Sequence, residues 1–239
     1  TFCFLAGIKQ LAGQTLWYGV SSIVPRLLNY LLTPYLTLKL SGASYGDMTL
    51  VYALISFLFI IYTYGLETAY FRFSQKEEYA EDLYNTTSVS IITSTILLTL
   101  VLWLFVEPLA RLTNVPEHPE YIKIALLVVA FDTLAVIPFA KLRQAGRPVK
   151  YAVVRISAVL LNIGALYFFL SAVISNGNFE TAFVIIANAF MSLFTLLLLW
   201  KEFKAFRWQF NTKLWKEIMI YSSPMLIVGF GGMVNETLD

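Results

Sequence analysis

The stretch that decides the fold is residues 120–141, which read EYIKIALLVVAFDTLAVIPFAK. Between its charged ends the only ionisable acidic or basic side chains are Lys123 and Asp132. A helix needs about 20 predominantly apolar residues to cross the hydrocarbon core of a membrane. We therefore predict that this stretch is a membrane-spanning helix.

Six more segments of similar length and character accompany it along the chain. Of the 239 residues, 58% are hydrophobic and 13% are charged, whereas soluble domains have about 45–50% apolar and about 25% charged residues. The mean hydropathy is +0.70. These values argue against a disordered chain or a soluble domain, and they predict an all-α, polytopic membrane helix bundle. The seven predicted spans are 15–38, 47–70, 84–106, 120–141, 149–172, 181–201 and 216–238.

Several classes of function have little support. Cys3 and His118 are the only residues of their kinds, so neither an intrachain disulfide nor a zinc cluster is expected, and we predict no metal and no cofactor. The chain has no basic patch of the kind that binds nucleic acid, which argues against nucleic acid as a partner. No loop shows the spacing of a catalytic triad or a carboxylate pair, so we expect no enzyme activity.

The distribution of lysine and arginine predicts the orientation. Cytoplasmic loops of membrane proteins carry an excess of these residues. With the N-terminus in the cytoplasm, three of them lie outside, namely Lys39, Arg111 and Lys123, and twelve lie inside, namely Lys9, Arg72, Lys76, Lys141, Arg143, Arg147, Lys150, Lys201, Lys204, Arg207, Lys213 and Lys216.

Four ionisable residues fall within the predicted spans, where charge is costly and often functional. They are Arg26, Glu67, Asp132 and Arg155. Each of these residues also has a structural explanation. Glu67 would reach the membrane interface, and Arg155 would extend its long stem to the lipid headgroups. Arg26 and Asp132 would form a buried ion pair.

The functional hypothesis is a cavity for a phosphate-bearing substrate. Guanidinium groups match phosphate geometry and stay charged in a low dielectric, so Arg26 and Arg155 are the predicted substrate-binding residues. Asp132 and Glu67 are the predicted ion-coupling or gating residues, with H⁺ or Na⁺ as the coupling ion.

Prolines within spans predict hinges, because a proline removes a helical hydrogen bond and kinks the helix. The candidates are Pro25, Pro34, Pro138 and Pro224. The alternative is the ordinary composition of membrane helices, in which proline is common.

Two connectors have a polar or mixed character. Residues 72–83 are rich in charge, which predicts a solvated inner connector, as a loop or a helical extension. Residues 201–216 alternate basic and aromatic side chains, which predicts an amphipathic helix on anionic lipids of the inner leaflet or a link between two bundles.

In the order and spacing of its motifs, the chain resembles the polysaccharide and oligosaccharide-lipid flippases (O-antigen exporter type) of the multidrug/oligosaccharidyl-lipid/polysaccharide exporter superfamily. The resemblance runs over nearly the whole chain from about residue 8. It rests on 11–22 (LAGQTLWYGVSS) with Arg26 and Thr33-Pro34, on 45–47 (YGD), 65–69 (GLETA), 71–73 (FRF), 131–133 (FDT), 137–143 (IPFAKLR) and 146–148 (GRP), and on Ser223-Pro224, Asn235-Glu236 and Leu238-Asp239.

The resemblance implies two six-helix lobes that rock between inward-open and outward-open states around a central cavity. It also implies an undecaprenyl-pyrophosphate-linked oligosaccharide as cargo, moved to the outer leaflet of the bacterial inner membrane for surface polysaccharide or O-antigen synthesis. On this basis residues 1–212 are expected to form the N-terminal lobe and residues 213–239 to begin the second lobe. The sequence then stops inside the seventh helix, so the rest of the second lobe is expected to be missing.

Three alternatives remain open at this stage. A multidrug or small-molecule exporter of the same superfamily would have acidic cavity walls. A membrane enzyme of envelope polysaccharide assembly would have a long catalytic outer loop. A single lobe without transport activity would serve as a scaffold.

Overall fold

The computed structural model describes residues 2–172 and 180–238, with the side chains of residues 13, 15–169 and 181–233. Over this part of the chain the regular elements are all helical, which confirms the predicted all-α membrane bundle. The connector between the predicted spans 149–172 and 181–201 falls largely on residues 173–179, which lie outside the described residues. The elements are α1 (Phe2–Lys39), α2 (Gly42–Thr63), α3 (Leu66–Phe73), η1 (Glu77–Tyr79), α4 (Asp82–Leu104), α5 (Val106–Leu112), α6 (Pro119–Gln144), α7 (Pro148–Ala172), α8 (Glu180–Leu198), α9 (Trp200–Lys204) and α10 (Thr212–Leu238).

Each of the seven predicted spans falls on a helix or on a pair of consecutive helices. By length and composition, five helical segments among the described residues can cross a membrane: Gly42–Phe73, Asp82–Leu104, Pro119–Gln144, Pro148–Phe169 and Thr181–Leu198. The remaining predicted spans, 15–38 and 216–238, are helical but less apolar. Arg26 and Asn29 interrupt the first, and Lys216 and Glu217 begin the second.

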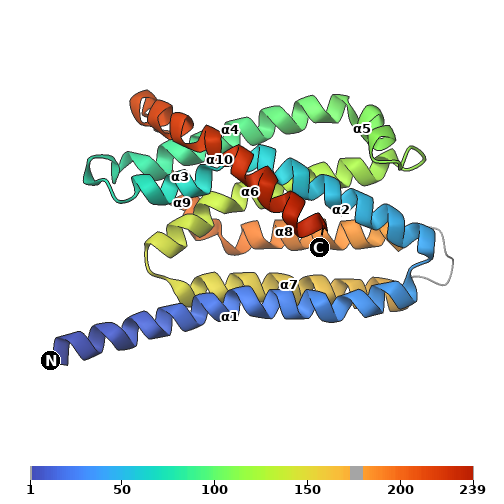
Figure 1. Ribbon diagram of the computed structural model, residues 1–239, viewed down its shortest axis with the longest axis horizontal. Coiled ribbons are helices and arrows are strands. Elements are labelled where there is room, and N and C mark those ends of the chain that lie inside the picture. The colour runs from blue at the N-terminus through green and yellow to red at the C-terminus, as the bar shows by residue number, and fades with distance from the viewer. Residues whose placement is uncertain (1, 173–179, 239) are drawn as a thin grey trace.

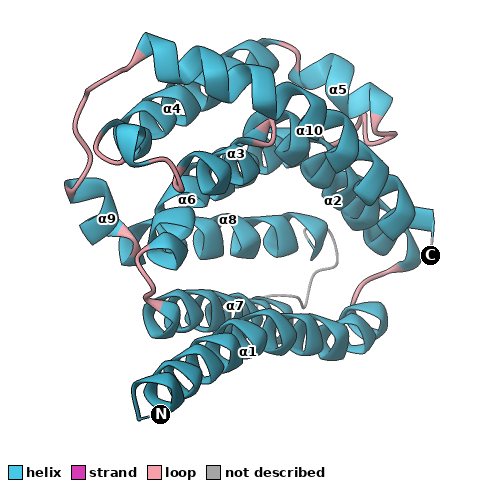
Figure 2. Cartoon of the chain, turned by 60° about the vertical axis from the view of Figure 1, so that its left-hand side comes forward, coloured by secondary structure: helices cyan, strands magenta, loops and turns pink. Residues whose placement is uncertain are grey.

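The helices form layers around α6, which packs against α2, α4 and α8. Alanines and branched apolar residues line most of its length, so Ala125, Val129 and Ile137 are fully buried. Figure 1 shows α1 and α7 side by side along one edge, with α10 crossing over the opposite side. In Figure 2, α8 lies between the α1–α7 pair and the remaining helices.

The second predicted span, 47–70, is broken rather than continuous. Tyr64 and Gly65 both adopt left-handed backbone angles, with φ of 35° and 70°, and separate α2 from α3. A Cβ atom on Gly65 would lie 2.6 Å from Cβ of Met225 and 3.0 Å from the carbonyl oxygen of Ser222. The break therefore brings the backbones of α3 and α10 into close contact at a residue without a side chain.

The predicted prolines do not end the helices that contain them. Pro25 and Pro34 lie inside α1, Pro138 inside α6 and Pro224 inside α10. Their role as hinges stays a prediction, and the observed break in α2–α3 occurs where the sequence has no proline.

The predicted amphipathic helix over 201–216 is wrong for its central part. Helix α9 ends at Lys204, and residues 206–211 are irregular. The Asn85 Oδ1 atom accepts a hydrogen bond from the backbone N–H of Arg207 at 3.0 Å, and Thr86 Oγ1 accepts one from Asn211 at 3.1 Å. These side chains of α4 therefore accept hydrogen bonds from backbone N–H groups that would bond to backbone carbonyl groups in a helix.

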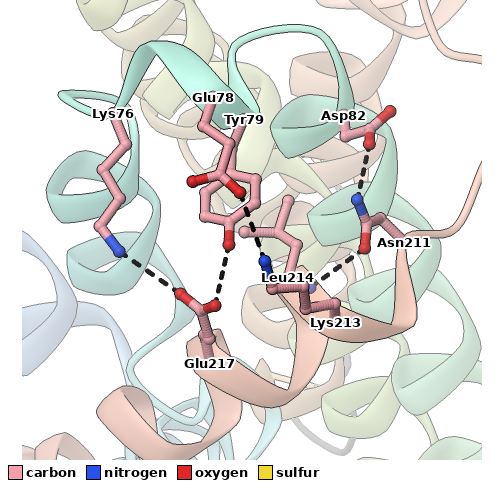
Figure 3. Close-up of polar contacts among 8 residues, drawn as sticks. All are labelled: Lys76, Glu78, Tyr79, Asp82, Asn211, Lys213, Leu214 and Glu217. Atoms are coloured by element: carbon pink, nitrogen blue, oxygen red, sulfur yellow. Dashed lines mark hydrogen bonds and ion pairs between the residues drawn. The ribbon is translucent and has the colours of Figure 1, made fainter.

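The connector 72–83 contacts the start of α10 instead of lying wholly in solvent (Figure 3). The Glu217 carboxylate accepts hydrogen bonds from Tyr79 Oη at 2.8 Å and from Lys76 Nζ at 3.3 Å. Lys213 pairs with Glu78 at 3.4 Å, and Asn211 Nδ2 donates to Asp82 at 2.7 Å. We call this set of contacts between residues 76–82 and 211–217 the polar clasp.

Candidate functional site

A cavity of about 680 Å³ opens between α2, α3, α6, α7, α8 and α10. Three of the four predicted charged site residues line it: Glu67 from α3, Asp132 from α6 and Arg155 from α7. Most of the remaining wall is apolar, and α10 contributes Gly229 and Gly232. The cavity thus brings together side chains from helices that are far apart in the sequence.

The fourth predicted residue, Arg26, does not line this cavity. Helix α1 packs mainly on α7, and Arg26 lies on its exposed side together with Ile23, Leu27 and Tyr30. None of the ion pairs among the described residues includes Arg26, so the alternative of a buried Arg26–Asp132 pair is not what the structure has.

Arg143, one of the twelve basic residues predicted on the inner side, also belongs to the site. Arg143, in the last turn of α6, forms an ion pair through Nη2 with Oε1 of Glu67. The Arg143 and Glu67 side chains are 32% and 42% exposed, so the pair is accessible. Glu67 lines the cavity, whereas Arg143 is not among its lining residues. Because Arg143 lies beyond the predicted span 120–141, the sequence predicts that it is a loop charge. No sequence signal indicates its contact with Glu67.

Aromatic rings hold both arginines of the site. The Arg143 guanidinium carbon lies 4.6 Å from the Phe71 ring centroid and 5.6 Å from that of Tyr151. The Arg155 guanidinium carbon lies 5.4 Å from the same Tyr151 ring and 5.2 Å from Phe139. Cations are attracted to aromatic faces at such distances. The two arginines therefore flank one shared ring.

Asp132 lies in a more polar part of the interior. Ser192 of α8 lies beside its carboxyl, and the positive charge of Arg155 acts on it. The Ser192 hydroxyl is fully buried. On the same helix, Asn188 donates to the Tyr52 hydroxyl at 3.0 Å, and its buried Oδ1 atom has no hydrogen-bond partner among the described residues.

The charges of the site nearly balance, with Arg143 and Arg155 facing Glu67 and Asp132. Guanidinium groups in a partly apolar cavity bind phosphate or carboxylate strongly, and carboxylates there bind a proton or a cation. The arrangement is therefore suited to an amphiphilic ligand with an anionic group, and it has acidic groups that can exchange a small cation.

A comparison with protein families adds an independent result. The sequence profile described as polysaccharide biosynthesis protein matches residues 11–239. The chain belongs to this family. As a polysaccharide biosynthesis protein with several apolar helices, it is a multi-pass membrane protein, and the family agrees with the resemblance to polysaccharide exporters found in the sequence. No curated protein and no solved structure matches it.

Proposed function

We propose that this polysaccharide biosynthesis protein is a flippase for lipid-linked oligosaccharides, with an undecaprenyl-pyrophosphate carrier as the lipid. The observation that carries the proposal is the 680 Å³ cavity that is lined by Arg155 and by Glu67, whose carboxylate pairs with Arg143 outside the lining. A cavity between membrane helices with one guanidinium group in its wall and a second one paired to a carboxylate of that wall suits a diphosphate, since arginine binds phosphate bidentately. On this proposal the protein translocates its ligand and carries out no chemical reaction.

We further propose that the N-terminus faces the cytoplasm of a bacterial inner membrane. The excess of lysine and arginine on the predicted inner loops supports this orientation. Arg143 and Arg155 lie near the α6–α7 connector, which is then cytoplasmic. The anion-binding groups would thus lie in the leaflet in which a lipid-linked sugar is assembled.

The proposed organisation is a lobe of residues 1–212 followed by the first helix of a second lobe, residues 213–239. Helix α10 contributes one wall of the cavity and is attached to the first lobe through the polar clasp. Movement of α10 away from α2 and α3 would open the cavity on this side. That movement would give the alternating access that the proposed transport requires.

Asp132 and Glu67 are proposed as the groups that couple transport to H⁺ or Na⁺. Both line the same cavity as Arg155, so a change in their charge alters the electrostatic field at an anionic ligand. Membrane carboxylates that face a cavity are the usual carriers of coupling ions.

These two carboxylates also favour a second candidate, an exporter of organic cations. Acidic cavity walls bind cationic drugs, and aromatic rings such as Phe139 would support them. Increased resistance to cationic dyes in an expressing strain, with no effect on surface polysaccharide, would identify this function.

The test of the first candidate is complementation of a flippase-deficient bacterial strain by the full-length gene, scored as surface polysaccharide at matched protein levels. We expect Arg155→Ala to reduce surface polysaccharide by about tenfold or more, since a charge-assisted hydrogen bond is worth about 1.5–3 kcal/mol. Arg26→Ala is the matched control, because Arg26 lies outside the cavity, and it should keep wild-type polysaccharide. Normal polysaccharide with Arg155→Ala, or failure of the wild-type gene to complement, would contradict the proposal.

A further inference from the structure

The Glu67–Arg143 ion pair lies beside the cavity, whose wall includes Glu67 but not Arg143. Glu67 lines the cavity and comes from the first turn of α3, directly after the break at Tyr64 and Gly65. Arg143 comes from the last turn of α6. Both side chains are about one-third or more exposed, so a water-soluble group can approach the pair.

Arg143 has contacts with aromatic rings in addition to its ion pair with Glu67. The rings of Phe71 and Tyr151 contact its guanidinium, and the Nε atom is buried without a hydrogen-bond partner among the described residues. Aromatic contacts orient the guanidinium plane and leave its N–H edge free for an anion. Arg143 therefore has donor capacity that the Glu67 carboxylate does not use.

The neighbouring charges explain why a carboxylate lies beside Arg143. Arg155 flanks the same Tyr151 ring, and its positive charge opposes that of Arg143. Two like charges in a partly apolar site require counter-ions, and Glu67 is the counter-ion in contact with Arg143. An incoming diphosphate would bring its own negative charge, and Glu67 would then repel it.

Glu67 has a second favourable position within its own helix. It lies in the first turn of α3, whose N-cap residue, Gly65, supplies no side-chain hydrogen bond. The N–H groups of a first helical turn lack intrahelical acceptors, and the helix dipole stabilises negative charge there. A carboxylate released from Arg143 can therefore turn towards these N–H groups while remaining ionised.

We propose that Glu67 is an exchangeable internal counter-ion that occupies the anion-binding position of Arg143 and is displaced by the diphosphate group of the transported lipid. This inference rests on the proposed function and adds to it a residue, Arg143, and a competition between protein carboxylate and ligand. Glu67 thereby sets the affinity of the cavity for anions, and ligand binding frees it at the break between α2 and α3.

The experiment measures binding of inorganic pyrophosphate to the full-length protein in lipid nanodiscs by titration calorimetry. Glu67→Gln removes the competing charge and should bind pyrophosphate about tenfold more tightly than wild type. Arg143→Gln should bind at least about tenfold more weakly, and the double variant should bind like Arg143→Gln alone. Glu217→Gln is the matched control, since Glu217 also forms an ion pair with a basic residue but lies in the polar clasp, and it should bind like wild type.

The outcomes separate this inference from the proposed function. Unchanged or weaker binding by Glu67→Gln, with weaker binding by Arg143→Gln, would overturn the counter-ion and leave the anion-binding cavity in place. Tighter binding by Glu217→Gln of equal size would also overturn it, because the effect would then be one of net charge. Absence of pyrophosphate binding by both wild type and Glu67→Gln, in samples that keep the wild-type unfolding temperature, would overturn both the counter-ion and the diphosphate ligand.

Discussion

The charged residues in the interior each have neighbours that offset the cost of leaving water. Arg143 pairs with Glu67, and the guanidinium of Arg155 lies on the rings of Phe139 and Tyr151. Asp132 lies beside a buried serine hydroxyl and is influenced by the charge of Arg155. Unpaired charge within a membrane costs several kcal/mol, so these partners allow the site to exist.

Gly65 offers a test of the backbone at the site. Gly65→Ala places a Cβ at positive φ and 2.6 Å from Met225 Cβ, so we expect the free energy of unfolding to fall by about 1–3 kcal/mol. Thermal unfolding in detergent measures the effect. Gly164→Ala is the control, because nothing lies within 4 Å of its added Cβ. Equal unfolding temperatures for the two variants would show that α10 does not approach α3 closely.

At the scale of elements, two interruptions shape the site. The break between α2 and α3 places Glu67 in the first turn of a new helix, and the irregular segment 206–211 aims α10 across α2 and α3. Side chains of α4 form hydrogen bonds with that segment. Asn211 directly precedes α10, and its Oδ1 atom accepts a hydrogen bond from the Leu214 N–H at 3.1 Å. The direction of α10 therefore depends on polar residues near one end of α4.

Asn211 tests this dependence. Asn211→Ala removes the cap of α10 and the contact with Asp82, so we expect a loss of about 1 kcal/mol in the free energy of unfolding. Asn211→Ser keeps a capping oxygen and should lose less than half as much. Chemical denaturation in mixed micelles, followed by tryptophan fluorescence, provides the measurement. If both variants were as stable as wild type, the start of α10 would not depend on this cap.

At the scale of the molecule, one side of the cavity is formed by α10, which packs on α2, α3 and α4, whereas α1 and α7 lie along the far edge (Figure 1). The start of α10 is anchored, because Leu214 and Ile218 are fully buried in a hydrophobic cluster with residues of α3, α4 and α6. Surface ion pairs such as Lys76–Glu217 add little to this attachment individually. The later part of α10, in which Ile227 and Val228 are exposed, is therefore the part suited to movement.

A cross-link tests whether α10 moves during transport. A Cβ on Gly229 would lie 3.0 Å from Cγ2 and 3.9 Å from Cγ1 of Ile60, so cysteines at these two positions are close enough to be tested for a disulfide, whose Cβ atoms lie about 3.5–4.5 Å apart. In a Cys3→Ser background, we expect the oxidised double variant Ile60→Cys with Gly229→Cys to lose most of its flux in proteoliposomes and to regain it on reduction. Each single variant serves as a control for the substitution alone. Full flux in the oxidised protein would mean that α10 and α2 stay together throughout the cycle.

Much of the fold could be predicted because membrane spans are set by local composition. A run such as 120–141 must satisfy its own backbone hydrogen bonds in hydrocarbon, so its helical state follows from its residues. The break at Tyr64 and Gly65 could not be predicted in this way, because it depends on the approach of α10 from a distant part of the chain. The segment 206–211 is similar, since its backbone partners are side chains of α4.

For the site, the amino-acid sequence is enough to identify the residues that carry unusual charge within the membrane, because only their depth along a span is needed. These residues are Glu67, Asp132 and Arg155, which line one cavity, and Arg26, which does not. The faces on which they lie depend on how the helices pack, since α1 packs on α7 and turns Arg26 outwards. Only the structure brought Arg143 to Glu67, because that contact joins the end of one helix to the break in another.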